Sequence, residues 1–387
     1  MANKENVKTN ILFVHHAGGF GGAPKSMSYI IKNLDVNRYN ATLINIVKGP
    51  VNEFFENIPV KLIVNNKIKA FHGSTVVEKS LKLFIYNWVY LIPSVLRATK
   101  IINKLKPDLI HLNSTCLFAF SIAARLSRVN PRVICHVREP LRKGLWGAPL
   151  RFFCKKNVDG FIGISQFDLG SLNISNSNSN QRIKTKLIYN FVNIDEYSPG
   201  ISKNTLRKKL NIKAGEIVFL YMARFAKSNG WEFLIERAKE MVIEHPNFHF
   251  VLLGSSAKQA EEIAAPGNVH IEQFTNEVID ILWDADVFVC PFIEPHFARG
   301  VIEASAVGLP ILASQIGGVD ELVKDGVTGF LYNNPKQFNN YAIQLGNNIE
   351  LRAQLGKNGR LFAEECFEQT KNLKETYEFY NEILTDK

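Results

Sequence analysis

A carboxylate inside an otherwise apolar helix is the first residue of this chain whose type and position suggest chemistry. Glu303 lies in the run VIEASA, and Gly308-Leu309-Pro310 after it is a typical helix stop signal. Such a carboxylate needs a polar partner, because an unpaired charge is costly away from water. The hydroxyls of a sugar or ribose could supply that partner, so Glu303 is a candidate ligand-binding residue.

Two glycines follow the next apolar run. Residues 311–313 predict a short buried strand, and Gly317-Gly318 lies at its carboxyl end, where open α/β sheets bind ligands. Glycines let a ligand approach the backbone and leave amide groups available to an anion. The segment therefore predicts ligand loops on both sides of the Glu303 helix, with these candidate contacts: Phe297, Arg299, Gly317, Gly318 and Val319.

Another glycine-rich loop, HHAGGFGGAP at residues 15–24, follows a strand predicted at 10–14. It does not keep the spacing of a dinucleotide-binding fingerprint, so a bare turn is one interpretation. The interpretation we favour is a loop that lets a substrate or donor phosphate approach the backbone. Gly19, Gly21 and Gly22 are then the candidate contacts.

The elements that must position these loops alternate between buried strands and helical stretches. This alternation favours parallel, doubly wound sheets, hence an α/β protein. A first unit closes around residues 188–199, and a second opens at 215–223. The predicted strands lie at 10–14, 41–47, 60–64, 108–112, 133–137, 160–164 and 186–189, then at 217–223, 248–253, 269–272, 287–290 and 311–313.

Residues 294–329 resemble the donor-binding region of glycosyltransferase family 4, retaining enzymes of the GT-B fold. The family pattern is roughly E-x-F-G-x-x-x-x-E-A-x-A-x-G-x-P, then G-G-x-x-E and D-G-x-x-G. It is matched at Phe297, Glu303, Ala304, Ala306, Gly308, Pro310, Gly317, Gly318, Glu321, Asp325, Gly326 and Gly329. Two positions depart from it: Ala298 replaces a usual Gly, and the first Glu aligns with Pro295, which leaves Glu294 one residue early.

This resemblance implies two doubly wound, Rossmann-like domains that face a cleft, with a C-terminal helix crossing back to the first. We expect an N-terminal acceptor-binding domain at 1–198 and a nucleotide-sugar-binding domain at 199–364. Residues 365–387 would form the returning helix. Weaker family matches at 18–24, 162–166 and 190–197 extend the resemblance over most of the chain.

The resemblance also implies catalytic roles for residues outside that segment. Arg224 matches the arginine of G-R-x-x-x-x-K-G, which grips the donor diphosphate in relatives, whereas Asn229 replaces the lysine and Lys227 stands two residues earlier. A guanidinium suits a phosphate because it donates in a planar fork. His136 matches a histidine that faces the donor sugar, and Glu294 would be the first loop carboxylate. Solvated loop charges and a satisfied core histidine are the alternatives.

No resident cofactor and no metal are expected. The pair Asp284 and Asp286 looks like a metal-binding D-x-D, but it lies between a helix and a strand, and the resemblance places it outside the donor site. The substrate implied by the resemblance is a nucleotide-diphosphate sugar, UDP- or GDP-linked.

Charge divides unevenly along the chain and bears on its partners. Residues 1–200 hold 27 Lys and Arg against 11 Asp and Glu, a net +16, and residues 201–387 hold 19 against 25, a net −6. The basic half should meet something anionic. No helix-turn-helix, RNP or zinc-finger pattern supports nucleic acid, which leaves an anionic membrane or a pyrophosphate-linked lipid.

The stretch at 79–106, KSLKLFIYNWVYLIPSVLRATKIINKLK, could be a buried helix or an interfacial element. It is too short and too interrupted to span a bilayer. The start of the chain lacks a signal-peptide pattern, and the five scattered cysteines indicate buried thiols in a reducing compartment. The expected location is therefore cytoplasmic, with peripheral binding to the inner face of the cell membrane.

These observations together predict a retaining transferase that moves a sugar from a nucleotide-diphosphate sugar to a hydroxyl of a glycan or lipid-linked acceptor, in cell-surface polysaccharide synthesis. A catalytically inactive GT-B subunit that binds nucleotide sugars is the alternative, favoured by Pro295, Ala298 and Asn229. A nucleotide-sugar epimerase on the same fold fits the sequence pattern less well.

Overall fold

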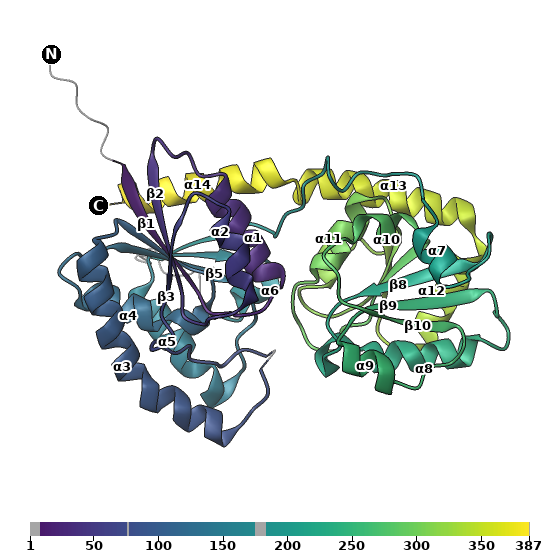
Figure 1. The fold of residues 1–387 in the computed structure, drawn as a ribbon, viewed down its shortest axis with the longest axis horizontal. Coiled ribbons are helices and arrows are strands. Elements are labelled where there is room, and N and C mark those ends of the chain that lie inside the picture. Colours follow the sequence, from purple (N-terminus) through teal and green to yellow (C-terminus); the bar gives the residue numbers. More distant parts are fainter. Residues whose placement is uncertain (1–7, 76, 175–182, 387) are drawn as a thin grey trace, which may run out of the picture. The chain divides into compact units, whose positions relative to one another are not determined.

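A computed structural model describes residues 8–75, 77–174 and 183–386 (Figure 1). The chain forms two compact units, Met1–Asn190 with Lys371–Lys387, and Phe191–Thr370. Each unit contains one parallel sheet with helices on its faces, which confirms the expected α/β class with two doubly wound domains. The chain leaves the first unit after Asn190, within the segment 188–199 expected to close it.

The first unit is built on a seven-stranded parallel sheet with the order β3-β2-β1-β4-β5-β6-β7. Its strands are β1 (Thr9–His15), β2 (Tyr39–Asn45), β3 (Lys61–Val64), β4 (Leu109–Leu112), β5 (Arg132–Val137), β6 (Gly160–Gly163) and β7 (Lys184–Leu187). Its helices are α1 (Gly22–Lys32), α2 (Glu53–Glu56), α3 (Leu81–Leu105), α4 (Ala119–Leu126), α5 (Ala148–Asn157), α6 (Gln166–Gly170) and α14 (Gln369–Thr385).

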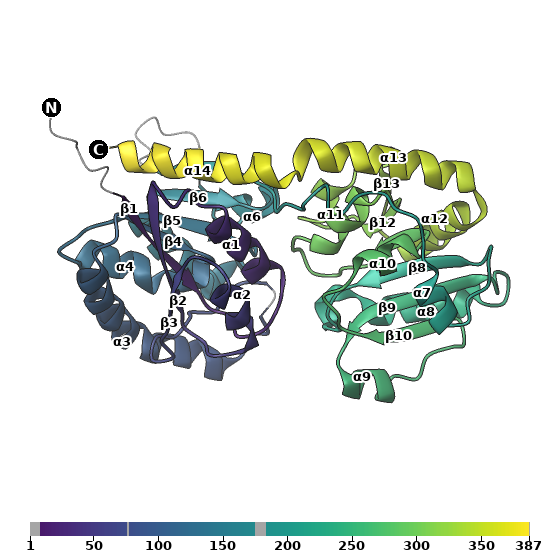
Figure 2. The ribbon, with the colours of Figure 1, turned by 45° about the horizontal axis from the view of Figure 1, so that its top comes forward.

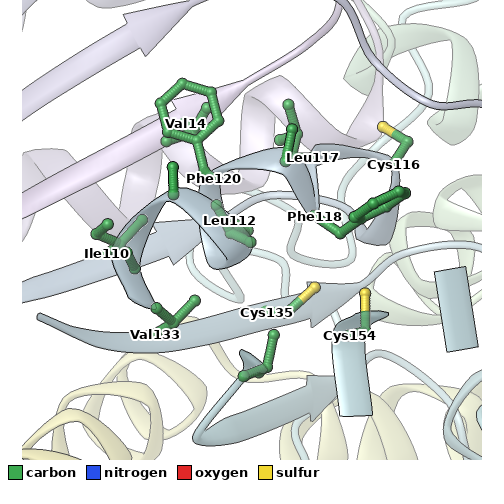
Figure 3. Close-up of a cluster of buried hydrophobic side chains, with 14 of the residues drawn as sticks. Val14, Ile110, Leu112, Cys116, Leu117, Phe118, Phe120, Val133, Cys135 and Cys154 are labelled. Carbon is green, nitrogen blue, oxygen red and sulfur yellow. The ribbon is translucent and has the colours of Figure 1, made fainter. Parts of the chain in front are cut away.

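The main core of this unit lies between the sheet and the helices α3 to α5 (Figure 3). Strand residues such as Val14, Leu112 and Val133 meet Phe118 and Phe120 from the start of α4. These strands have near-continuous apolar runs because both faces of a parallel sheet are covered. The cysteines are free thiols, and four of the five are buried.

Helix α14 lies on the first unit, although it ends the chain (Figure 2). Tyr377 donates from its hydroxyl to the carbonyl of Ile30 at 2.9 Å, and Tyr39 donates to Asn381 at 2.9 Å. A Cβ at Gly160 would lie 2.9 Å from the Phe379 ring, so this glycine lets the helix approach the sheet. The expected return of the C-terminal helix is confirmed.

The second unit has a six-stranded parallel sheet with the order β10-β9-β8-β11-β12-β13. Its strands are β8 (Ile217–Met222), β9 (Phe248–Ser255), β10 (Val269–Gln273), β11 (Val287–Cys290), β12 (Ile311–Ser314) and β13 (Gly329–Tyr332). Its helices are α7 (Thr205–Lys209), α8 (Trp231–Met241), α9 (Ala257–Glu262), α10 (Ile279–Trp283), α11 (Arg299–Ala306), α12 (Pro335–Asn347) and α13 (Ile349–Cys366).

Candidate functional site

The strand order of the second unit reverses between β8 and β11. Loops that leave neighbouring strands on the two sides of such a point diverge, and ligands of open α/β sheets bind there. Arg224 follows β8, Glu294 and Phe297 follow β11, and Gly317-Gly318 follows β12. The predicted residues of this unit therefore gather at the carboxyl edge of three adjacent strands.

The loop after β8 is held by hydrogen bonds to the backbone of Arg224, which leaves its side chain exposed. Tyr221 donates to the Arg224 carbonyl at 3.1 Å, and the amide of Asn229 donates to the same oxygen at 2.8 Å. Within the described part of the chain, no hydrogen bond or ion pair occupies the Arg224 guanidinium. The loop backbone is thus held in place, and it presents an available cation.

Asn229 stands where the family pattern has a phosphate-binding lysine, and the structure shows what it does instead. Its side chain is buried and bonded to Arg224, so it supports the loop rather than facing a ligand. Lys227, on the single turn at Lys227–Asn229, is exposed. Of the two alternatives left open by the sequence, only Lys227 can present a charge.

Close backbone approaches join the three loops. Gly230 has a φ of 70°, and a Cβ there would lie 1.8 Å from the Pro291 carbonyl oxygen. The amide of Ile293 donates to the Ser228 carbonyl at 2.9 Å. A Cβ at Gly318 would lie 3.1 Å from the backbone of His296. The glycines therefore fix the distance between the Arg224 loop, the Glu294 loop and the loop after β12.

His296 belongs to this site, although the sequence analysis did not select it. Its ring stacks on Phe292 with the centroids 4.2 Å apart, and its Nδ1 pairs with the Glu294 carbonyl at 2.9 Å. Burial lowers the pKa of His296; the hydrogen bond with the Glu294 carbonyl opposes this shift, and the nearby charge of Arg224 adds to it. The sequence held one signal that could have pointed to His296, namely the one-residue offset of the neighbouring Glu294 from the family pattern.

Glu303 is buried on α11 and has a protein partner. Arg299 Nε donates to Glu303 Oε1 at 2.9 Å, one helical turn away. The expected partner of Glu303 was a ligand hydroxyl, whereas in the structure at least one of its carboxylate oxygens accepts from Arg299. This largely buried ion pair orients both groups, because breaking it would leave an unpaired charge away from water.

The Asp284 and Asp286 pair has structural contacts. Asp284 Oδ2 accepts from the Leu206 amide at 2.7 Å, and Asp286 Oδ2 accepts from the Val218 amide at 2.7 Å and from Arg207 at 2.6 Å. Both carboxylates tie α7 to the sheet, in agreement with the structural interpretation.

The first unit has its own switch point, between β1 and β4, with a buried polar network beside it. Asn113 pairs with His15 Nδ1 at 3.0 Å and accepts from Arg138 Nε at 2.9 Å. Arg138 also donates to Asn190 at 2.7 Å, which accepts from Ser26 at 3.0 Å. The sequence could not show this network, because its members come from five separate segments.

His136 lies within the same network rather than at the surface. Its Nδ1 lies 3.1 Å from His111 Nε2 and 3.4 Å from Arg138 Nη2, and His111 also pairs with the hydroxyl of Tyr380 on α14. Burial lowers the pKa of His111 to about 3, with a further contribution from Arg138. Burial likewise lowers the pKa of His136. These contacts correspond to the satisfied core histidine that was the alternative for His136.

The glycine-rich loop of the first unit joins β1 to α1. A Cβ at Gly18 would lie 2.9 Å from Val47, so this glycine is packed, whereas a Cβ at Gly19 or Gly21 would meet no atom within 4 Å. Gly22 starts α1, whose first amides lack a side-chain cap. Gly19 and Gly21 therefore lie in open space beside a helix N-terminus, a geometry that suits an anion.

The residues at this edge of the second unit lie within a segment that matches a known protein family. Residues 202–362 match the family described as glycosyl transferases group 1. The chain is 30% identical to spore coat protein SA of Bacillus subtilis over 224 residues, which cover 51% of this chain and 59% of that protein. It spans 56% and 58% of two further relatives, so it covers little more than half of these curated proteins.

A longer match joins this chain to an Escherichia coli enzyme, UDP-Gal:alpha-D-GlcNAc-diphosphoundecaprenol alpha-1,3-galactosyltransferase. The two are 25% identical over 323 residues, 76% of this chain and 80% of that enzyme. Among solved structures, HepE of Anabaena in complex with UDP and glucose has a TM-score of 0.77 at 20% identity, covering 96% of this chain and 99% of its own. TarM has a TM-score of 0.71 at 15% identity, covering 100% of both chains. These likenesses confirm the GT-B fold.

Proposed function

We propose that this protein is a retaining glycosyltransferase that uses a nucleotide-diphosphate sugar. The observation that carries the proposal is the position of Arg224 at the switch point of the region that matches glycosyl transferases group 1, where hydrogen bonds to its carbonyl hold the loop and its side chain is exposed. The glycine loop at 317–318 and the Arg299–Glu303 pair support it, because the loop follows β12 and the pair lies on α11, which follows β11, at the same edge.

Each group has a chemical role in this proposal. Transfer breaks the bond between the sugar C1 and the diphosphate oxygen and forms a bond from C1 to the acceptor oxygen, while the leaving phosphate takes the acceptor proton. Negative charge grows on the diphosphate, and fixed donors aimed at such charge can be worth about 3–4 kcal/mol each. Arg224, Lys227 and the amides of Gly317 and Gly318 supply those donors, whereas the Val319 amide, also expected to contribute, already donates to the Ile316 carbonyl. Glu303, oriented by Arg299, accepts from the ribose hydroxyls.

The roles of the two units follow from their residues. The second unit holds the nucleotide sugar, and the basic first unit holds the acceptor, a glycan or a lipid-linked glycan. The E. coli relative acts on a diphosphoundecaprenol acceptor by its name, which supports a lipid-linked acceptor here. The HepE complexes contain UDP and UDP-glucose, which supports a UDP-linked donor. The reaction would take place at the inner face of the cell membrane.

One observation favours an inactive subunit that only binds nucleotide sugar. Asn229 replaces the phosphate-binding lysine of the family pattern and is buried, so the site has one cation fewer unless Lys227 takes its place. Such a subunit would bind a nucleotide sugar without releasing nucleotide.

Mass spectrometry of the full chain with a panel of UDP- and GDP-sugars separates the two functions. The enzyme should release free nucleotide diphosphate from at least one donor, and faster with a lipid-linked glycan acceptor present. Saturable donor binding without nucleotide release would establish the subunit instead. Absence of both binding and release for every donor would contradict both proposals.

A further inference from the structure

Helix α3 of the first unit buries Val95, Ala98 and Ile102 in the core and presents a second apolar face to solvent. Five large aliphatic residues form its solvent-facing stripe: Leu81, Ile85, Val89, Ile92 and Leu96, with exposed fractions of 72%, 55%, 60%, 69% and 57%. At about 100° per residue they fall within an arc of roughly 80°. The spacing is that of one helix face, and this face points to solvent.

The inner face of the same helix carries two polar anchors in addition to its core residues. Asn87 is buried and bonds in both directions with the backbone of His72, donating at 2.8 Å and accepting at 3.2 Å. Ser94 is buried and accepts from the Lys69 amide at 3.0 Å. These bonds fix the rotation of α3, so the aliphatic stripe cannot turn inward without breaking them.

Positive charge lies beside the stripe. Lys82, Lys100 and Lys104 are exposed on the arc next to the aliphatic residues, and residues 79–106 contain no Asp or Glu. Trp146 packs on Phe84 near the start of α3, with the ring centroids 5.2 Å apart. This contact places the adjacent residue Leu145, which is 80% exposed, close to the same end of the helix.

We propose that this surface, formed by the α3 stripe, its three lysines and Leu145, docks on an anionic lipid bilayer with α3 parallel to the membrane plane. Aliphatic side chains would enter the interface while lysines reach the headgroups, the arrangement of an interfacial amphipathic helix. No helix in the described ranges is long and apolar enough to cross a membrane, so the contact is peripheral. A second copy of the chain is a poorer occupant, because a two-fold contact would oppose the same lysines.

Vesicle co-sedimentation of the full chain tests this surface without any assay of sugar transfer. The protein should pellet with vesicles that contain phosphatidylglycerol, bind weakly to pure phosphatidylcholine vesicles, and dissociate as salt is raised. The double variant Ile85→Ser/Ile92→Ser should lower the partition coefficient at least about tenfold. Lys100→Gln/Lys104→Gln should lower it roughly tenfold at low salt and little at high salt.

The matched control for the aliphatic pair is Ile201→Ser/Ile243→Ser, since these residues of the second unit are 88% and 85% exposed. Binding should change less than about twofold, because scattered exposed residues are not a docking face. Unchanged circular dichroism and thermal unfolding show that each variant is folded. Wild-type protein that stays in the supernatant with anionic vesicles overturns the proposal. Equal loss of vesicle binding in the two isoleucine double variants also overturns it. A wild-type dimer that only Ile85→Ser/Ile92→Ser disrupts would do the same.

Discussion

At the scale of single residues, the proposed reaction depends most on the side chain of Arg224. Arg224→Ala should lower kcat/KM for the donor roughly 100-fold or more, because a positioned charge donor to the leaving diphosphate is lost. Stability should change by less than about 0.5 kcal/mol, since the side chain is exposed. Steady-state nucleotide release and thermal unfolding measure both. Lys239→Ala, an exposed cation on α8, is the control, and unchanged turnover in folded Arg224→Ala would exclude the role.

Glu303 separates a binding role from a structural one. Glu303→Gln keeps an acceptor but loses the charge, so affinity for the nucleotide diphosphate should weaken roughly tenfold. Because Arg299 loses its ionic partner, stability should fall as well. Calorimetric titration and denaturant unfolding record the two effects. Glu364→Gln is the control, because Glu364 pairs with Arg360 at the same spacing on α13. Lower stability with unaltered affinity would make Glu303 purely structural.

At the scale of elements, the turn before α8 should be sensitive to a single methyl group. Gly230→Ala combines a φ of 70° with a clash on the Pro291 carbonyl, and should cost on the order of 3 kcal/mol. Gly215→Ala has a φ of 86° but open space, and should cost only about 1 kcal/mol. Urea unfolding compares them. Equal losses of unfolding free energy in Gly230→Ala and Gly215→Ala would show that the close contact between the Arg224 loop and the Glu294 loop does not matter for stability.

His111 on β4 contacts His136 on β5 and Tyr380 on α14, and its burial predicts that the free energy of unfolding depends on pH. The folded pKa of His111 is about 3, below its ordinary 6.5, so unfolding takes up a proton below pH 6.5. The stabilising contribution is complete above pH 6.5 and is lost as pH falls towards 3, at up to about 1.4 kcal/mol per pH unit. His136, Arg138 and Tyr380 face this ring.

His111→Asn should therefore reduce the slope of unfolding free energy between pH 6.5 and pH 5, even if the variant is less stable at pH 7. Urea unfolding at several pH values measures that slope. His245→Asn, outside the network, is the control. An unchanged slope in His111→Asn would mean that other groups cause the acid sensitivity.

At the scale of the whole molecule, the proposed reaction neutralises the diphosphate with side chains and amides of the chain. Asp284 and Asp286 are engaged by backbone amides and Arg207, which agrees with their structural interpretation. Nucleotide release should therefore persist within about twofold in EDTA. Loss of activity in chelator, restored by Mg²⁺ or Mn²⁺, would show that the donor site needs a metal.

The sequence by itself determined the two doubly wound sheets, the positions of nearly all strands and the grouping of Phe297, Glu303 and Gly318. These features follow from local signals, namely apolar runs, helix stops and glycines at strand ends. The family pattern added Arg224 to this group, although Arg224 lies far from Glu303 and Gly318 along the chain.

Only the tertiary structure decided which partner each polar group has. Glu303 pairs with Arg299, Asn229 turns inward to Arg224, and His136 joins His111 and Tyr380. The two faces of α3 were also undecided, because an apolar helix can be buried or can present that face to an interface. Its rotation is fixed by hydrogen bonds with distant backbone, in which Asn87 donates to the His72 carbonyl and Ser94 accepts from the Lys69 amide. Partner choice depends on contacts between segments far apart in sequence, and periodicity along one segment carries no information about them.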